Sequence, residues 1–431
     1  MKDFGKSDDP RVQAQLDRLA ALTVPQGRLG LETIRALMER LGNPHRKLPP
    51  VFHVAGTNGK GSTCAFLRAM LEAQGYKVHA TTSPHLVRYN ERIRIAGRLI
   101  EDKALAVLLA EVLDAGEDLA PSFFEVTIAA AFLAFSRTPA DACVIEVGLG
   151  GRFDATNVLE PEVLAACGIA SLGIDHERFL LAPEDGVPSE PITRIAFEKA
   201  GIAKPSVPLV AQDYPLAATK AVIDQTMKAG ARPALRGLDW TWSIEQGALV
   251  YQDKLGQLEL PQPSLHGEHQ YANAALAVAM LRHQNAIEVS TGYMESGLTN
   301  TRWPARLHRL AEGKLVHGRE VWLDGGHNPD AGATLARHFS GQHLHLIIGM
   351  LDNKDPAALV GQLGESIVSI SAVPVPDHDY HPSAKFGPDA QAFRDVPSAL
   401  AALPDDGLPV LIAGSLYLAG EVLRLNGELP D

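Results

Sequence analysis

A glycine-rich turn between an apolar strand and a helix constrains this chain more than any other feature of its sequence. The apolar run Val51–Ala55 leads into the turn, and an apolar helical pattern follows it to about Gly75. Glycines let the backbone approach a polyphosphate, free N–H groups at the helix start bind its oxygens, and a lysine adds positive charge. The sequence therefore predicts a nucleoside triphosphate site formed by Gly56, Thr57, Asn58, Gly59, Lys60, Gly61 and Ser62.

The turn departs from the general phosphate-binding pattern at two positions. Val54 stands where the first glycine belongs, and Gly61 replaces the hydroxyl residue after the lysine. That hydroxyl normally holds Mg²⁺. Either Ser62 takes over this role or the metal ligands come from elsewhere in the chain. A turn that merely connects a strand to a helix is the alternative, which the apolar strand and helix on either side disfavour.

Composition narrows the classes of protein to be considered. The 431 residues are 46% hydrophobic, which suggests a globular protein of two or three domains. A net charge of -12 without basic runs argues against nucleic-acid binding. Cys64, Cys143 and Cys167 lie far apart in apolar segments, as reduced core thiols do. With no apolar signal core or membrane-spanning run, a soluble, cytoplasmic protein is expected.

Strand and helix patterns alternate along the chain, which predicts an α/β fold with a mainly parallel sheet and helices on both faces. In the first part, strand-like runs lie at 51–55, 76–82, 142–147, 163–170 and 207–210, and helical patterns at 31–41, 62–74, 103–114, 122–136, 215–229 and 268–283. Short antiparallel strands are expected within 238–261. The rhythm restarts beyond about residue 298, with strands at 320–324, 344–349, 366–372 and 409–413. Residues 295–305 are the best linker candidate.

Three polar side chains follow predicted strands and are expected at the same edge of the sheet, where parallel α/β folds bind ligands. Glu146 ends an apolar strand before a glycine-rich loop, His176 follows another strand in Gly-Ile-Asp-His, and Ser83 follows a third. A buried carboxylate needs a cation, and Mg²⁺ beside a nucleotide would provide one. The structural alternatives are an ion pair of Glu146 with an arginine such as Arg152, a hydrogen-bonding histidine and a turn serine before proline.

Taken together, the motifs resemble a known family. The ordered set H-V-A-G-T-N-G-K-G-S-T, T-T-S-P-H-L, F-F-E, E-V-G-L-G-G-R-F-D-A-T-N, G-I-D-H, E-K-A-G-I and D-G-G-H-N-P is similar to the folylpolyglutamate synthase and dihydrofolate synthase family of the Mur ligase superfamily. The resemblance implies a P-loop Mur-ligase-type ATPase domain over residues 1–298. A smaller Rossmann-like α/β domain, the glutamate ligase domain, would occupy residues 299–431.

The activity that this resemblance implies is ATP-dependent amide formation through an acyl phosphate. L-Glutamate would be joined to 7,8-dihydropteroate, giving dihydrofolate, and to tetrahydrofolate, giving folylpolyglutamates. The implied cofactors are ATP and Mg²⁺, the partners are these small molecules rather than nucleic acid or membrane, and a monomer is expected. The nearest alternative is a polyglutamate synthase without dihydropteroate activity. A muramyl ligase is disfavoured by Gly61, and a non-enzymatic nucleotide switch would not need the D-G-G-H-N-P segment.

The resemblance also assigns roles to individual residues. It makes Ser83, Glu146 and His176 the metal ligands, and it adds Asn273, Arg306 and Asp324 to the ATP site. Because the last two belong to the second domain, domain closure would assemble the active centre. Lys199 corresponds to a lysine that the family carbamylates, although alone it would pass for a surface helix lysine. Lys60, Glu146, His176 and Lys199 are thus the predicted catalytic residues.

Substrate contacts follow in the same way. Aromatic faces suit the flat pterin, but Phe123 and Phe124 could equally be core residues at the start of a helix. The implied pterin residues are Leu29, Gly30, Leu31, Glu32, Ser122, Phe123, Phe124, Glu125, Phe153, Asp154 and Ala155. His327 and Ser415 would help to seat glutamate. The segment 177–198 departs from the family pattern by its greater length, and it is expected to form a surface loop before Lys199.

Overall fold

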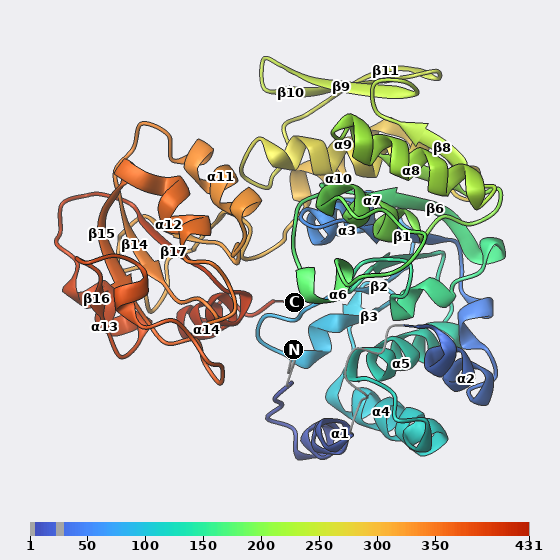
Figure 1. Cartoon of the computed structure of the whole chain (residues 1–431), viewed down its shortest axis with the longest axis horizontal. Helices are drawn as coiled ribbons and strands as arrows, with labels where there is room; N and C mark the ends of the chain where they lie inside the picture. Colours follow the sequence, from blue (N-terminus) through green and yellow to red (C-terminus); the bar gives the residue numbers. More distant parts are fainter. Residues whose placement is uncertain (1–4, 23–29, 431) are drawn as a thin grey trace. The chain divides into compact units, whose positions relative to one another are not determined.

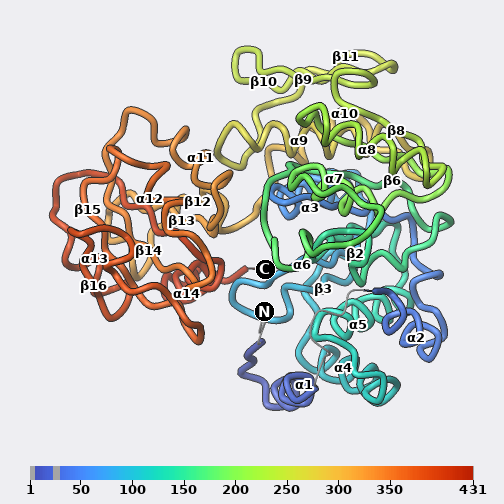
Figure 2. The backbone as a smooth tube through the Cα atoms, in the orientation of Figure 1, coloured from blue at the N-terminus to red at the C-terminus, as the bar shows by residue number. Residues whose placement is uncertain are grey.

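The computed structural model describes residues 5–22 and 30–430 of the chain. It divides into two compact units, which Figures 1 and 2 trace from blue to red along the sequence. Unit 1 comprises Met1–Ser264 and Gln270–Thr301, and unit 2 comprises Leu265–His269 and Arg302–Asp431. The chain therefore enters unit 2 briefly before it returns to unit 1. The functional boundary at residues 298/299 stays a prediction.

Unit 1 is built on an eight-stranded sheet of order β4-β3-β2-β5-β1-β6-β7-β8. The six strands from β2 to β8 in this order are parallel, and β3 and β4 form an antiparallel edge. Their bounds are β1 Val51–Ala55, β2 Val78–Thr81, β3 Ile93–Ile95, β4 Arg98–Leu99, β5 Ala142–Glu146, β6 Leu164–Ile169, β7 Pro208–Ala211 and β8 Arg232–Leu235. The carboxyl ends of β2, β5, β1 and β6 are thus neighbours along one edge.

Helices cover the sheet because its central strands are apolar on both faces, as parallel strands usually are. All five residues of β1 are buried. Val51 and Ala55 join the core formed with α4 and α5, whereas Phe52 and Val54 alternate to the opposite face. The helices are α1 Pro10–Ala21, α2 Glu32–Arg40, α3 Lys60–Ala73, α4 Asp102–Gly116, α5 Phe123–Arg137, α6 Glu177–Leu180, α7 Pro191–Ala200, α8 Leu216–Lys228, α9 His269–Arg282 and α10 Thr291–Asn300.

A small antiparallel sheet of order β11-β10-β9 forms a separate layer of unit 1, at the top in Figure 1. Its strands are β9 Trp240–Glu245, β10 Ala248–Asp253 and β11 Gly256–Leu260. Asp253 accepts two hydrogen bonds from Arg282, at 2.7 and 2.6 Å, which ties the sheet to the end of α9. This confirms the short antiparallel strands expected within residues 238–261.

Unit 2 has a six-stranded sheet of order β12-β13-β17-β14-β15-β16, parallel except for β12. A core with Leu346, Leu411 and Phe339 fills the space between sheet and helices. Its strands are β12 His308–Arg309, β13 Val321–Leu323, β14 Leu344–Ile348, β15 Ile367–Ala372, β16 Gln391–Ala392 and β17 Val410–Ala413. Its helices are α11 Pro329–His338, α12 Ala357–Leu363, α13 Val396–Ala402 and α14 Leu416–Asn426. The two parallel-rich sheets with their helices confirm the predicted α/β fold.

Two segments differ from the sequence expectations. Residues 295–300 of the linker candidate form the end of α10. This helix packs closely on α3, since a Cβ on Gly297 would lie only 2.5 Å from the Met70 Cα. The segment 177–198 is not a loop throughout, since it contains α6 and most of α7. The linker candidate does contain the boundary between the units, which lies between Thr301 and Arg302. Its first residues are helical because Gly297 allows close packing of α10.

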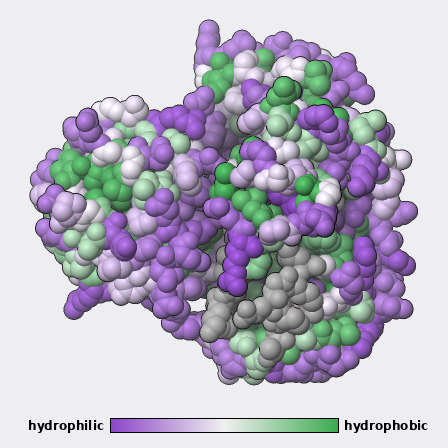
Figure 3. Space-filling view, viewed as in Figure 1, coloured by the Kyte–Doolittle hydropathy of each residue, from purple (hydrophilic) through white to green (hydrophobic). Residues whose placement is uncertain are grey.

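The surface of each unit is mainly hydrophilic on the face shown in Figure 3. Hydrophobic residues form small separate patches there. Within the described part of the chain, no helix is both long and apolar enough to cross a membrane.

Candidate active site

The phosphate turn lies between β1 and α3 and is held by backbone contacts. The Nζ of Lys60 donates to the carbonyls of Gly56 and Thr57 at 3.0 and 3.1 Å, so the ammonium group folds back over the turn. Thr57 fixes the loop that follows β6, since its N–H donates to the Ser171 carbonyl at 2.7 Å and its hydroxyl to the Gly173 carbonyl at 2.8 Å. The turn and this neighbouring loop therefore form one bonded unit.

Glycine is required at two positions of the turn. Gly59 has a φ of 84°, and a Cβ there would lie 2.2 Å from the Oδ1 of Asn273 on α9. Gly56 has a φ of 152°, and its Cβ would lie 2.9 Å from that of Ala170. The structure thus places Asn273 directly beside the phosphate turn, although the two are far apart in the sequence. Its amide donates to Gln270 at 3.0 Å.

Glu146 ends β5 next to the turn, paired in register with Val54 of β1. Its side chain is buried, and its Oε2 accepts a hydrogen bond of 3.0 Å from the N–H of Ser83, which follows β2. The negative charge of Glu146 also contributes, after burial, to the raised pKa of the Cys64 thiol on α3. Ser83 and Glu146 therefore lie together at the carboxyl edge of the sheet, as predicted.

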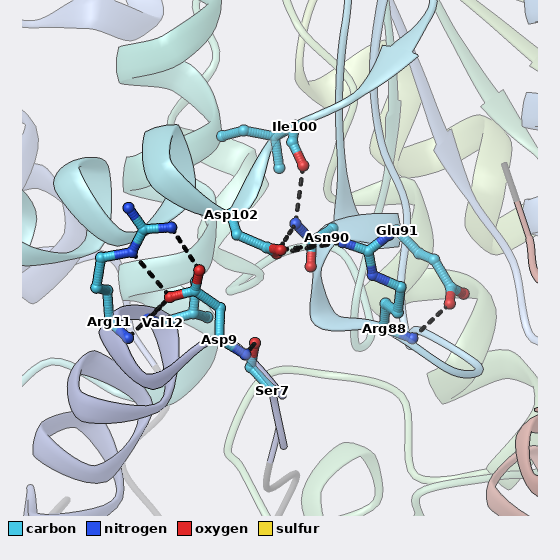
Figure 4. A network of polar contacts seen from close by, with 9 residues as sticks. All are labelled: Ser7, Asp9, Arg11, Val12, Arg88, Asn90, Glu91, Ile100 and Asp102. Carbon is cyan, nitrogen blue, oxygen red and sulfur yellow. Dashed lines mark hydrogen bonds and ion pairs between the residues drawn. The ribbon is translucent and has the colours of Figure 1, made fainter.

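The loop that carries Ser83 is fixed by a polar network, which Figure 4 shows in part. Glu91 accepts hydrogen bonds from the N–H groups of Leu86, Val87 and Arg88 at 2.6 to 2.8 Å, and the figure draws the bond from Arg88. Asn90 donates to Asp102 at the start of α4 and to the Ile100 carbonyl, each at 2.8 Å. These bonds hold the segment after Ser83 on α4 and the β3–β4 hairpin.

His176 lies just after the loop that Thr57 fixes, at the start of α6. Its backbone has a φ of 53°, a left-handed conformation that costs energy in residues other than glycine and is frequent at functional sites. Its N–H donates to the Oδ1 of Asp175 at 2.7 Å. Among the described residues no three His, Cys, Asp or Glu side chains gather to hold a metal, and the predicted set includes a serine. The ligand role of Ser83, Glu146 and His176 stays a prediction.

Arg152 is not the ion-pair partner of Glu146, because it pairs with other carboxylates. Its guanidinium donates to Glu184 at 2.5 and 2.8 Å and to Glu198 at 2.8 and 3.1 Å. It also lies over the Phe153 ring at 4.2 Å. Arg152 is therefore used to join its own loop to α7 rather than to neutralise Glu146.

Lys199 is buried at the end of α7 and is not a surface lysine. Burial and, to a smaller extent, the positive charge of Lys60 lower the pKa of its ammonium group to about 7, against the opposing effects of Asp175 and Asp154. A lysine with this pKa is a neutral amine in about half of the molecules at pH 7, and the neutral form can act as a nucleophile toward CO₂. The longer preceding segment does not prevent Lys199 from reaching the site.

The two candidate pterin phenylalanines are only partly buried, and each has a defined neighbour. The Phe124 ring packs on Gly148, where a Cβ would lie 2.4 Å from the ring, two residues after Glu146. Phe123 contacts Tyr89 edge to face at 5.5 Å, and the Arg92 guanidinium lies 5.3 Å from its ring. Since both rings pack against the core without being enclosed by it, they remain candidates for a flat ligand.

Several other pterin candidates have structural roles of their own. Ser122 and Glu125 form a capping box at the start of α5, with bonds of 2.7 and 3.2 Å. Asp154 is buried and accepts from Leu149 N–H and from the Thr156 hydroxyl at 2.8 and 2.5 Å. Burial raises the pKa of this carboxyl group.

The remaining pterin candidates are less informative. Leu31 belongs to the core of unit 1, and Gly30 and Glu32 are neighbours at the start of α2. Ala155 is buried, whereas Leu29 lies outside the described residues. Substrate contacts by the whole set stay predictions.

Unit 2 gathers its candidates at the carboxyl ends of β13 and β17, which are adjacent and parallel. Asp324 is buried and accepts hydrogen bonds of 2.7 Å from the N–H groups of Leu307 and Gly326. Burial raises the pKa of its carboxyl group, and the charge of nearby Arg306 opposes this rise. Ser415 caps α14, and His327 bonds the Gly325 carbonyl at 3.0 Å.

Sequence reasoning missed Asp175, which lies within reach of Lys199, and Gln270, which bonds Asn273. Asp175 could have been found, because it directly precedes His176 in Gly-Ile-Asp-His at a strand end. Gln270 carried no distinguishing pattern.

Known proteins resemble this chain over nearly its whole length, although no protein-family model matches it. The dihydrofolate synthase/folylpolyglutamate synthase of Bacillus subtilis is 33% identical, over 92% of this chain and 94% of that protein. Escherichia coli FolC in complex with DHPP and ADP has a TM-score of 0.85 and 30% identity, covering 96% of this chain and 97% of that one.

A second solved structure has a bifunctional folylpolyglutamate synthase/dihydrofolate synthase with Mn, AMPPNP and L-glutamate bound. It has a TM-score of 0.82 and 30% identity, with 96% and 97% of the two chains covered. These similarities cover more than nine tenths of this chain and so extend through both units. The chain therefore belongs to the dihydrofolate synthase/folylpolyglutamate synthase family.

Proposed function

We propose that this protein is a bifunctional ATP-dependent ligase that adds L-glutamate to 7,8-dihydropteroate and to tetrahydrofolate. One observation carries the proposal. The phosphate turn follows β1, and Glu146 and Gly148, on which Phe124 packs, lie at the end of the adjacent strand β5, so all of them share one edge of the sheet. An anion-binding turn suited to a nucleotide and an aromatic surface suited to a heterocycle thus occur side by side. Family membership supports the same activity.

The reaction needs activation, because a carboxylate does not acylate an amine directly. The acceptor carboxylate attacks the γ-phosphorus of ATP and releases ADP, which gives an acyl phosphate. The glutamate amine then attacks the acyl carbon, and phosphate leaves while the amine loses a proton. Lys60 would stabilise the charge that develops on the transferred phosphoryl group, since its Nζ already lies over the turn. Asn273 would contact the nucleotide from α9.

The residues present fit a divalent cation. Glu146 provides a buried carboxylate beside Lys60's turn, and a buried carboxylate with a nearby nucleotide is a typical Mg²⁺ environment. Ser83, Glu146 and His176 would hold the ion. When bound, it would neutralise phosphate oxygens of ATP. Lys199, as a carbamate, would supply a further negative group near Lys60.

Four further features belong to the proposal. Arg306 and Asp324 would contact ATP, and His327 and Ser415 would seat glutamate. We also propose a monomer located in the cytoplasm, which the three buried free thiols Cys64, Cys143 and Cys167 support.

The decisive experiment offers purified protein ATP, Mg²⁺ and L-glutamate with dihydropteroate or tetrahydrofolate in separate reactions. Mass spectrometry would identify the products, and ADP release without acceptor would be the background. Products with both acceptors are expected. Product with tetrahydrofolate alone would establish the monofunctional alternative, and product with neither would refute the proposed activity.

A further inference from the structure

Four charged side chains of unit 1 form a closed ring in which the signs alternate. Glu184 bonds both Nη atoms of Arg152, at 2.5 and 2.8 Å, and pairs with Arg194 at 2.8 Å. Glu198 completes the ring, since it pairs with Arg152 at 2.8 Å and with Arg194 at 3.0 Å. Each arginine therefore has two carboxylate partners, and each carboxylate has two arginine partners.

The ring joins three separate segments of the chain. Arg152 belongs to the glycine-rich loop after β5, Arg194 and Glu198 belong to α7, and Glu184 belongs to the long connection between α6 and α7. The loop and α7 also touch through their backbones, because Arg152 N–H donates to the Glu198 carbonyl at 2.8 Å. Glu184 is the one ring member from the connection, so it alone links the connection to α7 and to the glycine-rich loop within the ring.

Two neighbours of the ring are predicted functional residues. Arg152 lies over the Phe153 ring at 4.2 Å, and Phe153 is a predicted pterin contact. Glu198 directly precedes Lys199 in the last turn of α7. A shift of the ring would therefore move the glycine-rich loop that carries Phe153 and the helix α7 that carries Lys199 relative to each other.

We propose that Glu184 is a positioning residue. It acts through Arg152 and Arg194 to hold the glycine-rich loop with Phe153 and the helix α7 with Lys199 in fixed relative positions. This inference rests on the proposed ligase function. It gives a role to the connection that sequence analysis treats as a surface loop.

Burial explains why the second carboxylate matters. The side chains of Arg194 and Glu198 are 6% and 5% exposed, whereas Glu184 is 38% exposed and closes the ring from the solvent side. Without Glu184, two guanidinium groups would share Glu198 alone, which leaves one uncompensated positive charge in a largely buried cluster. Arg152 would then be free to leave Phe153, and Glu198 would be drawn out of its present position.

The test compares Glu184→Gln with Asp185→Asn. Asp185 is the adjacent residue, is exposed and forms no ion pair with the described part of the chain. Both changes remove one negative charge, so they have the same effect on net charge. We expect Glu184→Gln to lower kcat/KM for the folate acceptor about tenfold, as a misplaced reacting group does. The KM for ATP should stay unchanged, because the phosphate turn is not part of the ring, and Asp185→Asn should behave as the wild type.

A double-mutant cycle with Arg194→Gln gives a second, independent measurement. If Glu184 acts through the ring, the double variant should lose less activity than the product of the two single losses, since both changes break the same ring. Multiplicative losses would overturn the inference. So would a Glu184→Gln enzyme with a lower Tm but wild-type kinetic constants, because the ring would then serve stability alone.

The same assay separates the two proposals. A wild-type protein that ligates neither acceptor would refute the proposed function, and the inference with it. A wild-type protein that ligates, together with a Glu184→Gln variant indistinguishable from Asp185→Asn, would refute the positioning role alone.

Discussion

The Oδ1 of Asn273 lies 2.2 Å from the point where a Cβ atom would stand on Gly59. Helix α9 thus closes one side of the phosphate turn so tightly that only a residue without a side chain fits. This contact links two motifs that are more than two hundred residues apart, and it makes a direct test of the nucleotide site possible.

Gly59→Ala should weaken ATP binding at least about tenfold, because the new methyl group displaces Asn273 and strains a residue with a positive φ. Isothermal titration calorimetry would measure the affinity. Gly292→Ala is a suitable control, since that glycine lies near the start of α10 with no atom close to its Cβ position. Unchanged ATP affinity in Gly59→Ala would show that Asn273 does not border the nucleotide.

Glu146→Gln should keep the fold and lower kcat by about a hundredfold, because the amide has almost the same shape but no charge to hold a metal ion. Activity would be measured across a Mg²⁺ titration, with Glu111→Gln of α4 as a control that removes an exposed carboxylate. Near-normal turnover of Glu146→Gln at low Mg²⁺ would contradict the ligand role.

Lys199 should be active as a carbamate. Above its pKa of about 7 the amine is neutral and reacts with CO₂, whereas below that value it is protonated and cannot. Activity should therefore fall as the pH drops below about 7, and added bicarbonate should restore part of it. Lys199→Ala should be nearly inactive and partly rescued by small carboxylic acids.

The Lys199→Arg variant tests whether the carbamate is required. Arginine is positively charged at this position and cannot become the anion. A fully active Lys199→Arg enzyme would therefore exclude the carbamate role.

The acyl phosphate route predicts the fate of one oxygen atom. If the acceptor carboxylate carries heavy oxygen, one labelled oxygen should pass to inorganic phosphate in each turnover, as mass spectrometry of the phosphate would show. An attack of the glutamate amine on ATP would instead give a phosphoramidate and unlabelled phosphate. Unlabelled phosphate with normal amide formation would refute the intermediate and leave the ligase activity standing.

Local patterns predicted much of the fold. The apolar runs that became β1, β5 and β14 are short, buried and bounded by glycine or polar residues, so their positions agree with the structure to within a residue or two. The hairpin of β3 and β4 was missed, because its strands have only three and two residues. Edge strands of that length have no periodicity to detect.

The site was predicted less completely, for a different reason. Ser83, Glu146 and His176 could be placed at one sheet edge because parallel strands end together there. The partners of Arg152 could not, since Glu184 comes from a connection whose sequence suggests only exposure. The burial of Lys199 depends on packing between α7 and the glycine-rich loop, which no local pattern encodes.

The brief visit of Leu265–His269 to unit 2 has a practical consequence. A single protease cut at the junction near residue 301 would not separate the two units cleanly, because these five residues of unit 2 would stay in the polypeptide of unit 1. A gene fragment beginning at Arg302 would likewise lack part of the folded unit. Exchange of unit 2 between relatives should therefore carry both segments, because a transplant of the carboxyl-terminal part alone would combine residues from two different parents within one folded unit.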